Sequence, residues 1–160
     1  MGVVLVTGMS GAGKSTVLSE LARQGLATVD TDYGSWCHEV DGDYQWDEQK
    51  MSSILAEPQP EVLYVSGTVS NQGQFYDRFE AVVLLTAPQD LLFHRLATRT
   101  TNNYGKSEAE RQEIGHYIRT VEPMLRKTAT HVINTAGSVQ AVVARLIEIG
   151  AAPCADRINP

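Results

Sequence analysis

Three glycines, a lysine and three hydroxyl side chains are concentrated in the stretch GMSGAGKST, residues 8–16, and two of the hydroxyls directly follow the lysine. The stretch fits the pattern G-x-x-x-x-G-K-[ST] without a mismatch, with Lys14 followed by Ser15 and Thr16. Glycine lets the backbone approach a ligand closely, so consecutive N–H groups can point at phosphate oxygens. The lysine ammonium can neutralise the β- and γ-phosphates, and the Ser15 hydroxyl can bind Mg²⁺. The stretch therefore predicts a site for a polyphosphate and a metal ion.

Consecutive residues of this stretch should supply the contacts to a bound nucleotide. The apolar run Val3–Val6 precedes it and an amphipathic segment follows it, which is the strand, loop and helix setting that phosphate binding requires. The alternative is a tight glycine turn with an exposed lysine. We expect ATP to be held by Gly8, Ser10, Gly11, Ala12, Gly13, Lys14, Ser15 and Thr16.

Two aspartates follow the second strand-like run, in the sequence TVDTD. Ligands bind at the carboxyl ends of strands in open parallel sheets, and a spacing of two places Asp30 and Asp32 on the same side. We expect Asp30 to hold Mg²⁺ together with Ser15, and Asp32 to orient or deprotonate a phosphoryl acceptor. Which aspartate is the base stays open at this point. The alternative is a turn in which an aspartate caps the chain.

Two arginines lie four residues apart, at Arg95 and Arg99, just before the polar loop TTNNYGKS at 100–107. This spacing places both on one face of a helix. With Lys106 in the loop, they can stabilise a phosphoryl group in transfer by closing over it. The alternative is a solvated helix face.

The elements that position these residues alternate along the chain between strand-like and helical patterns, which is typical of a parallel α/β fold. Ser107 and Glu110 form a possible capping box, and Pro123 should bend or end the helix that contains it. We expect strands near 2–7, 26–30, 61–66, 81–86 and 130–134, and helices near 14–24, 47–56, 89–99, 107–126 and 138–149.

Composition limits the classes of function. The 160 residues fit one domain at 1–150 with a tail at 151–160, and 42% are hydrophobic. A net charge of −6 argues against binding to nucleic acid or to an anionic membrane. Cys37 and Cys154 are far apart and should be free thiols, and the four histidines show no metal-ligand spacing. The first strand begins almost at Met1, so we expect a cytoplasmic protein; its oligomeric state stays open.

Taken together, GMSGAGKS, VDTD, HRLATR and INTAGS resemble the small P-loop kinases, a group that includes nucleotide, shikimate and gluconate kinases. The resemblance implies a P-loop NTPase three-layer α/β sandwich, with a five-stranded parallel sheet in the order 2-3-1-4-5 and helices on both faces. Asp30 and Asp32 match the D-x-D of shikimate kinases, and Arg95 and Arg99 match the lid region. ATP and Mg²⁺ are the implied cofactors. The implied segments are an acceptor-binding insert at about 31–60, a lid at about 95–110 and an adenine-side loop at 135–138.

The acceptor signatures of those kinases are missing after the third strand, where this chain reads SGTVSNQG and has no aspartate at the strand end. The segment 31–80 holds ten acidic residues and two basic ones, a net charge of −8. An acidic acceptor would call for arginine forks. We therefore expect a neutral or cationic acceptor, such as a nucleoside, sugar, aminocyclitol or aminoglycoside-like compound. The alternatives are a nucleoside monophosphate or shikimate/gluconate-type acceptor, and an acidic surface without a role in specificity.

The sequence thus predicts an ATP-dependent kinase that transfers the γ-phosphoryl group to a hydroxyl of a small molecule. Two rival classes stay open. One is a non-catalytic nucleotide-binding regulatory module, and the other is an ATP hydrolase in which Gln72 or Gln74 positions water. The aromatic residues of the insert either line the acceptor pocket or pack in the core; they are Tyr33, Trp36, Tyr44 and Trp46.

Overall fold

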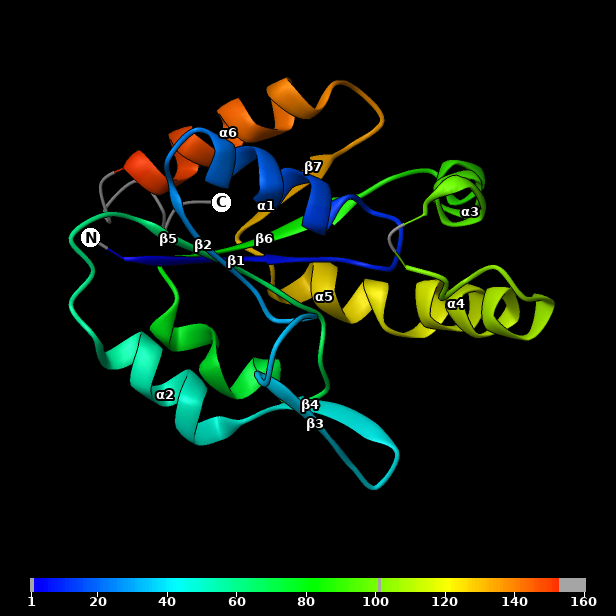
Figure 1. Ribbon diagram of the computed structural model, residues 1–160, viewed down its shortest axis with the longest axis horizontal. Coiled ribbons are helices and arrows are strands. Elements are labelled where there is room, and N and C mark those ends of the chain that lie inside the picture. The colour runs from blue at the N-terminus through cyan, green and yellow to red at the C-terminus, as the bar shows by residue number, and fades with distance from the viewer. Residues whose placement is uncertain (1, 101, 153–160) are drawn as a thin grey trace.

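A five-stranded parallel sheet forms the centre of the computed structural model, which describes residues 2–100 and 102–152 (Figure 1). The strand order is β2-β5-β1-β6-β7. When the parallel strands alone are numbered, this is the predicted order 2-3-1-4-5; the labels differ because a hairpin adds two strands between β2 and β5. The parallel strands are β1 (Val3–Thr7), β2 (Ala27–Asp30), β5 (Leu63–Ser66), β6 (Ala81–Thr86) and β7 (His131–Asn134).

Helices cover both faces of this sheet, as predicted. Residues of β1 alternate between the faces: Val4 and Val6 pack toward α1 (Lys14–Arg23) and α6 (Val139–Ala151), whereas Val3 and Leu5 pack toward the other layer. Figure 1 shows α1 and α6 on one side of the sheet and α2 on the other, with α3 and α4 beyond the end of the sheet. The remaining helical segments are α2 (Glu48–Ala56), the 3₁₀ helix η1 (Gln72–Arg78), α3 (Gln89–Thr98), α4 (Glu108–Thr120) and α5 (Glu122–Thr128).

The single helix expected at 107–126 is two helices in the structure, α4 and α5, which meet at Val121. Pro123 lies in the first turn of α5. Backbone N–H groups in the first turn of a helix have no partner within the helix, so a proline, which has no N–H, is tolerated there. Inside a continuous helix its ring would clash with the preceding turn. The capping box of Ser107 and Glu110 is present at the start of α4.

The insert at 31–60 contains a β-hairpin that the sequence analysis missed. Its strands are β3 (Cys37–Val40) and β4 (Asp43–Trp46), paired antiparallel, and Figure 1 shows the hairpin projecting from the body of the molecule. The turn residues Asp41 and Gly42 have φ angles of 52° and 85°. Two positive φ angles suit a two-residue hairpin turn, and Asp-Gly is a strong sequence signal for it.

Two predictions concern the ends of the chain and its location. The predicted tail at 151–160 lies outside the described residues from residue 153 onward, as does Thr101 in the predicted lid. Within 2–100 and 102–152, no helix has the length and apolar character needed to cross a membrane. The cytoplasmic location stays a prediction.

Candidate functional site

The glycine-rich loop between β1 and α1 has the backbone that the sequence predicts. Gly8, Gly11 and Gly13 have φ angles of 152°, 85° and 102°. A Cβ atom on Gly8 would lie 2.5 Å from the Leu85 carbonyl oxygen, so a side chain does not fit there. Gly13 is the N-cap of α1 and supplies no side-chain cap. The first N–H groups of α1 are therefore available to an anion.

Lys14 folds back onto this loop. Its Nζ donates to the carbonyl oxygens of Gly8 at 2.6 Å and Met9 at 3.2 Å. Burial lowers the pKa of the Lys14 ammonium, while the carboxylates of Asp32 and Asp30 act in the opposite direction. A bound phosphate would add negative charge beside Nζ and favour the charged form.

Ser15 and Asp30 meet at the start of α1, as predicted. The Ser15 Oγ donates to Asp30 Oδ2 at 2.7 Å. The second carboxylate oxygen, Oδ1, accepts from the Asp32 backbone N–H at 3.1 Å, which orients the group. A hydroxyl and a carboxylate at the carboxyl end of β2 are hard oxygen ligands of the kind that Mg²⁺ prefers.

Ser66 adds a further hydroxyl near this pair. It ends β5 and pairs with Asp30 in the strand register, so both side chains lie on the same face of the sheet. Ser66 is fully buried, and its Oγ has no hydrogen-bond partner among the described residues. A buried hydroxyl without a partner is uncommon, and a metal-bound water would satisfy it. Ser66 is the last residue of β5, the third parallel strand, whose end carries no aspartate in this sequence.

These oxygens fit a magnesium ion that arrives with a nucleotide. No cluster of three or more metal-binding His, Cys, Asp or Glu side chains occurs in the part of the chain that the structure describes. Mg²⁺ commonly binds through one or two protein oxygens, with phosphate oxygens and water completing the shell. Ser15 and Asp30 would hold the ion, and the Ser66 hydroxyl would contact one of its bound water molecules.

A cleft of about 390 Å³ opens over the loop. Residues from the stretch 10–16 line one side, and Asp32 and Arg99 are also among the lining residues. Burial raises the pKa of the Asp32 carboxyl, Lys14 opposes this, and the charge of Asp30 adds to it. Asp32 thus faces the cleft with a greater proton affinity than an ordinary aspartate has.

Arg95 is among the residues that line the cleft, and it anchors the loop. Its guanidinium donates to the Gly11 carbonyl oxygen at 3.2 Å, to Thr135 Oγ1 at 2.9 Å and to the Thr135 carbonyl oxygen at 2.6 Å. The sequence predicts a clamp that closes over the phosphates; in the structure, backbone carbonyls and the Thr135 hydroxyl accept from the guanidinium. Arg95 joins α3, the loop and the segment after β7.

Arg99 organises the segment predicted to be a lid. Its Nε donates to the Asn102 carbonyl oxygen at 3.0 Å, and its guanidinium donates to the Tyr104 carbonyl oxygen at 2.6 Å. A second hydrogen bond joins the same segments, because the Lys106 Nζ donates to the Arg99 carbonyl oxygen at 2.6 Å. Arg99 therefore both faces the cleft and holds the connection between α3 and α4.

Two threonines that the sequence analysis missed hold the loop at both ends. Thr68 Oγ1 donates to the Gly8 carbonyl oxygen at 2.6 Å and lies 3.1 Å from the Gly8 nitrogen. Thr135 Oγ1 donates to the Ala12 carbonyl oxygen at 2.8 Å. Thr135 directly follows β7, and Thr68 comes two residues after β5, so their position near a strand end was a usable signal.

The glutamines and aromatic residues named from the sequence divide between the core and the surface: Gln72 and Trp46 are buried, whereas Gln74, Tyr33 and Tyr44 are exposed. The buried Gln72 uses its amide nitrogen on Thr7 Oγ1 and its amide oxygen on the Val69 N–H. Trp46 is fully buried, and its Nε1 donates to Thr31 Oγ1 at 2.9 Å. Tyr33 is the aromatic residue of the insert that lines the cleft.

Comparison with known proteins places this geometry in a group. Residues 4–116 match a family model described as an AAA domain. No curated protein matches the sequence. The chain is similar to shikimate kinase from Acinetobacter baumannii in complex with shikimate, at 20% identity over 93% of this chain and 92% of that chain, with a TM-score of 0.65. A gluconokinase from Sinorhizobium meliloti 1021 has 18% identity over 94% and 91%, with a TM-score of 0.63. At these identities the likeness establishes the fold.

Proposed function

The chain belongs to the AAA domain family and has the fold of the small P-loop kinases, and from this premise we propose that it is an ATP-dependent small-molecule kinase. The observation that carries the proposal is the convergence of Lys14, the Ser15–Asp30 pair and Asp32 on one cleft. A phosphate nest alone would serve a binding module. A carboxylate with raised proton affinity beside the nest also supplies a base for an acceptor hydroxyl.

Each of these groups has a role in transferring the γ-phosphoryl group. The N–H groups of the loop bind the phosphates, and Lys14 exchanges its contacts with Gly8 and Met9 for phosphate oxygens. Mg²⁺, when bound with ATP, neutralises charge on the phosphates. Asp32 accepts the proton of the acceptor hydroxyl while the hydroxyl oxygen attacks the γ-phosphorus. The bond from the γ-phosphorus to the β,γ-bridging oxygen breaks, and ADP leaves.

Arg95 and Arg99 have different parts in this scheme. Arg95 keeps the loop in shape through Gly11 and Thr135. Arg99 lines the cleft while it fixes the turn through Tyr104, so movement of that turn brings a positive charge toward the phosphates. Excluding water during transfer favours the acceptor hydroxyl over hydrolysis.

We further propose that the acceptor is neutral or cationic. Both basic residues of the acidic segment 31–80 are engaged away from the cleft: Arg78 donates to the Ser52 carbonyl oxygen on α2, and Lys50 donates to the Ser35 carbonyl oxygen. Arg95 and Arg99 direct their guanidinium groups at backbone carbonyls. An acidic acceptor would need a guanidinium directed at its carboxylate or phosphate for bidentate capture. None of the three arginines has its guanidinium free for this contact, and Lys50 has no guanidinium.

The hydrolase alternative lacks support from the two glutamines named for it. Gln72 is buried with both ends of its amide in hydrogen bonds, and Gln74 donates to Glu48 Oε1 at 2.9 Å. Neither glutamine is among the residues that line the cleft, where a water molecule would have to be positioned beside the γ-phosphate. A kinase therefore fits the site better than a hydrolase does.

Acceptor-stimulated consumption of ATP tests the proposal. The purified protein, with ATP and Mg²⁺, is given nucleosides, sugars, aminocyclitols and aminoglycosides, and separately nucleoside monophosphates, shikimate and gluconate. We expect one neutral or cationic acceptor to stimulate consumption and Lys14→Met to abolish it. Stimulation by shikimate or a monophosphate would contradict the acceptor class but not the kinase. ATP binding without consumption for any acceptor would contradict the kinase.

A further inference from the structure

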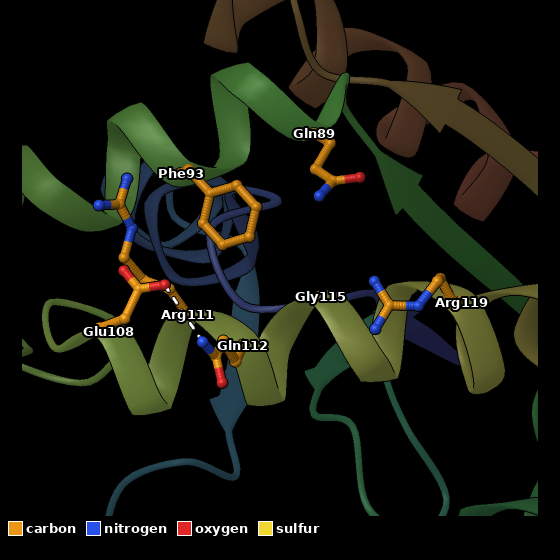
Figure 2. A pocket seen from close by; sticks show the side chains of 7 residues that line it. All are labelled: Gln89, Phe93, Glu108, Arg111, Gln112, Gly115 and Arg119. Carbon is orange, nitrogen blue, oxygen red and sulfur yellow. Dashed lines mark hydrogen bonds between the residues drawn. The ribbon is translucent and has the colours of Figure 1, made fainter.

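A second hollow, of about 650 Å³, lies between α3 and α4 and shares no lining residue with the cleft over the loop. Figure 2 shows Gln89 and Phe93 pointing from α3 toward α4, with Gly115 and Arg119 on the facing side. The hollow is wide and open to solvent, because most of its lining side chains, including Gln89, Arg111 and Arg119, are exposed. The proposed kinase mechanism makes no use of it.

Gly115 forms the floor of this hollow from the middle of α4, where glycine is unfavourable. A glycine inside a helix costs about 1 kcal/mol relative to alanine. Packing does not require it here, because a Cβ atom at this position would meet only Arg119, whose guanidinium nitrogen lies 3.4 Å away. Gly115 is nevertheless buried, because the Arg119 side chain folds back over it, and the two residues together line this part of the hollow.

The hollow is also positively charged. Arg111, Gly115 and Arg119 are four residues apart in turn and share one face of α4. Among residues 2–100 and 102–152, neither arginine forms an ion pair with a carboxylate, although the whole chain carries a net charge of −6. The Arg111 guanidinium carbon lies 5.4 Å from the centre of the half-buried Phe93 ring, an arrangement that fixes the ring.

The two ends of the hollow differ. Glu108 lies near the Arg111 end and accepts a hydrogen bond from Gln112, so a carboxylate offsets positive charge there. At the other end the Arg119 side chain runs back along α4 toward Gly115, on the side of the gap opposite Gln89 (Figure 2). A guanidinium fork suits a carboxylate or phosphate, an aromatic ring suits a flat ligand, and an amide suits a polar substituent.

We propose that this hollow is a binding site, separate from the nucleotide cleft, for a small aromatic molecule that carries one anionic group. The ring of the ligand stacks against Phe93 in the space between α3 and α4. Its phosphate or carboxylate pairs with Arg119, and Gln89 donates to or accepts from a ring substituent. The site stands on the geometry of α3 and α4 and does not depend on the kinase reaction.

Phenyl phosphate is a suitable probe, because it joins the two features that the site should recognise. We would titrate the full chain and follow backbone amide signals by NMR, with inorganic phosphate and phenol as separate half-ligands. We expect saturable shifts at Phe93, Gly115 and Arg119, and weaker binding of either half-ligand. No saturable shift on α3 and α4, or shifts confined to residues 8–16, would overturn the proposal.

Variants separate a specific site from general attraction of anions. Arg119→Gln should weaken phenyl phosphate binding at least about tenfold, since a charge-assisted hydrogen bond is lost. Gly115→Leu should fill the hollow and remove binding. Arg145→Gln, an exposed arginine on α6, is the matched control and should leave the affinity unchanged.

Folding of each variant is checked by thermal unfolding, and Gly115→Ala should unfold at a higher temperature than wild type because alanine favours the helix. If Gly115→Leu does not fold, Arg119→Gln alone decides. Equal affinity in Arg119→Gln and wild type would overturn the proposal.

Discussion

Ser15 and Asp30 should act as one unit in binding magnesium, so removing either should remove the same stabilisation of bound nucleotide. Their side chains are joined by a hydrogen bond of 2.7 Å, and both lie at the carboxyl end of the sheet. The perturbation is a double-mutant cycle of Ser15→Ala and Asp30→Asn. The cycle isolates what the two residues do together.

The expected magnitude follows from the contact itself. A hydrogen bond that involves a charged group contributes about 1.5–3 kcal/mol, which corresponds to roughly ten- to a hundredfold in affinity. Each single variant should therefore lose about this much of the tightening that Mg²⁺ gives to ADP binding. The double variant should lose little more of this tightening than the worse single variant, because the metal contact is already lost once either residue is replaced.

The assay is calorimetric titration of ADP with Mg²⁺ and, separately, with a chelator. Without metal the Ser15→Ala protein should bind ADP as wild type does. Asp30→Asn should bind it equally or more tightly, since a negative charge facing the phosphates is gone. Ser19→Ala, an exposed hydroxyl on α1, is the matched control and should change neither titration.

Additive losses in the cycle would refute the shared site, because two independent residues would each contribute separately. An unchanged magnesium effect in either single variant would refute it as well. A large loss of ADP affinity in the chelator would show that the pair shapes the loop and does not bind the metal.

Three further predictions concern Asp32, Arg95 and Gly105. Desolvation at the cleft raises the pKa of Asp32 above its usual 3.8, but the residue is largely exposed, so its ionised carboxylate opposes folding only slightly at neutral pH and not at lower pH, where folded and unfolded states are both protonated. Asp32→Asn should therefore unfold at the same or a slightly higher temperature than wild type at pH 7, while transfer falls by about a hundredfold or more; a clearly lower unfolding temperature at pH 7 would contradict this. Arg95→Lys cannot keep the forked contact with Thr135, so calorimetry should show both a lower unfolding temperature and weaker ADP binding; a change in neither would contradict the anchoring role. Gly105 is buried with a φ of 94°, and a Cβ there would lie 3.0 Å from Ile114 and 3.1 Å from Leu96. Urea unfolding of Gly105→Ala should therefore show a free energy of unfolding lower by about 1–2 kcal/mol. A variant as stable as wild type would contradict a strained fit of this turn.

The sequence predicted the parallel sheet well because its three central strands, β1, β5 and β6, are buried almost throughout and therefore read as apolar runs. The run at 81–86 matches β6 at both ends, and Gly25 and Pro88 lie at the boundaries of α1 and α3. The hairpin was missed for a different reason. Its strands are short and mostly exposed, so the apolar pattern is weak, and only the Asp41-Gly42 turn identifies it.

The residues of the candidate site also fall into a part that the sequence predicts and a part that it does not. Ser15, Asp30 and the loop could be placed from the sequence, because a local motif and one strand end position them. The contacts of Thr68 with Gly8 and of Thr135 with Ala12 arise only when the strand order brings distant strand ends together. No local pattern records these contacts.

The arginines illustrate a further limit. Arg95 and Arg99 were located correctly at the cleft, but their partners are backbone carbonyls. Every residue carries such an acceptor, so the sequence cannot single out which one a guanidinium will meet. The hollow over Gly115 likewise exists only because α3 and α4 lie face to face.

Transfer of an isotopically marked γ-phosphoryl group tests the central claim most directly. ATP with ¹⁸O in its γ-phosphate is incubated with the protein, Mg²⁺ and the stimulating acceptor, and the products are read by mass spectrometry. The account predicts that the label appears on the phosphorylated acceptor, and that Lys14→Met and Asp32→Asn remove that product. Label recovered only in inorganic phosphate, at a rate that the acceptor does not change, would contradict a kinase and indicate a hydrolase.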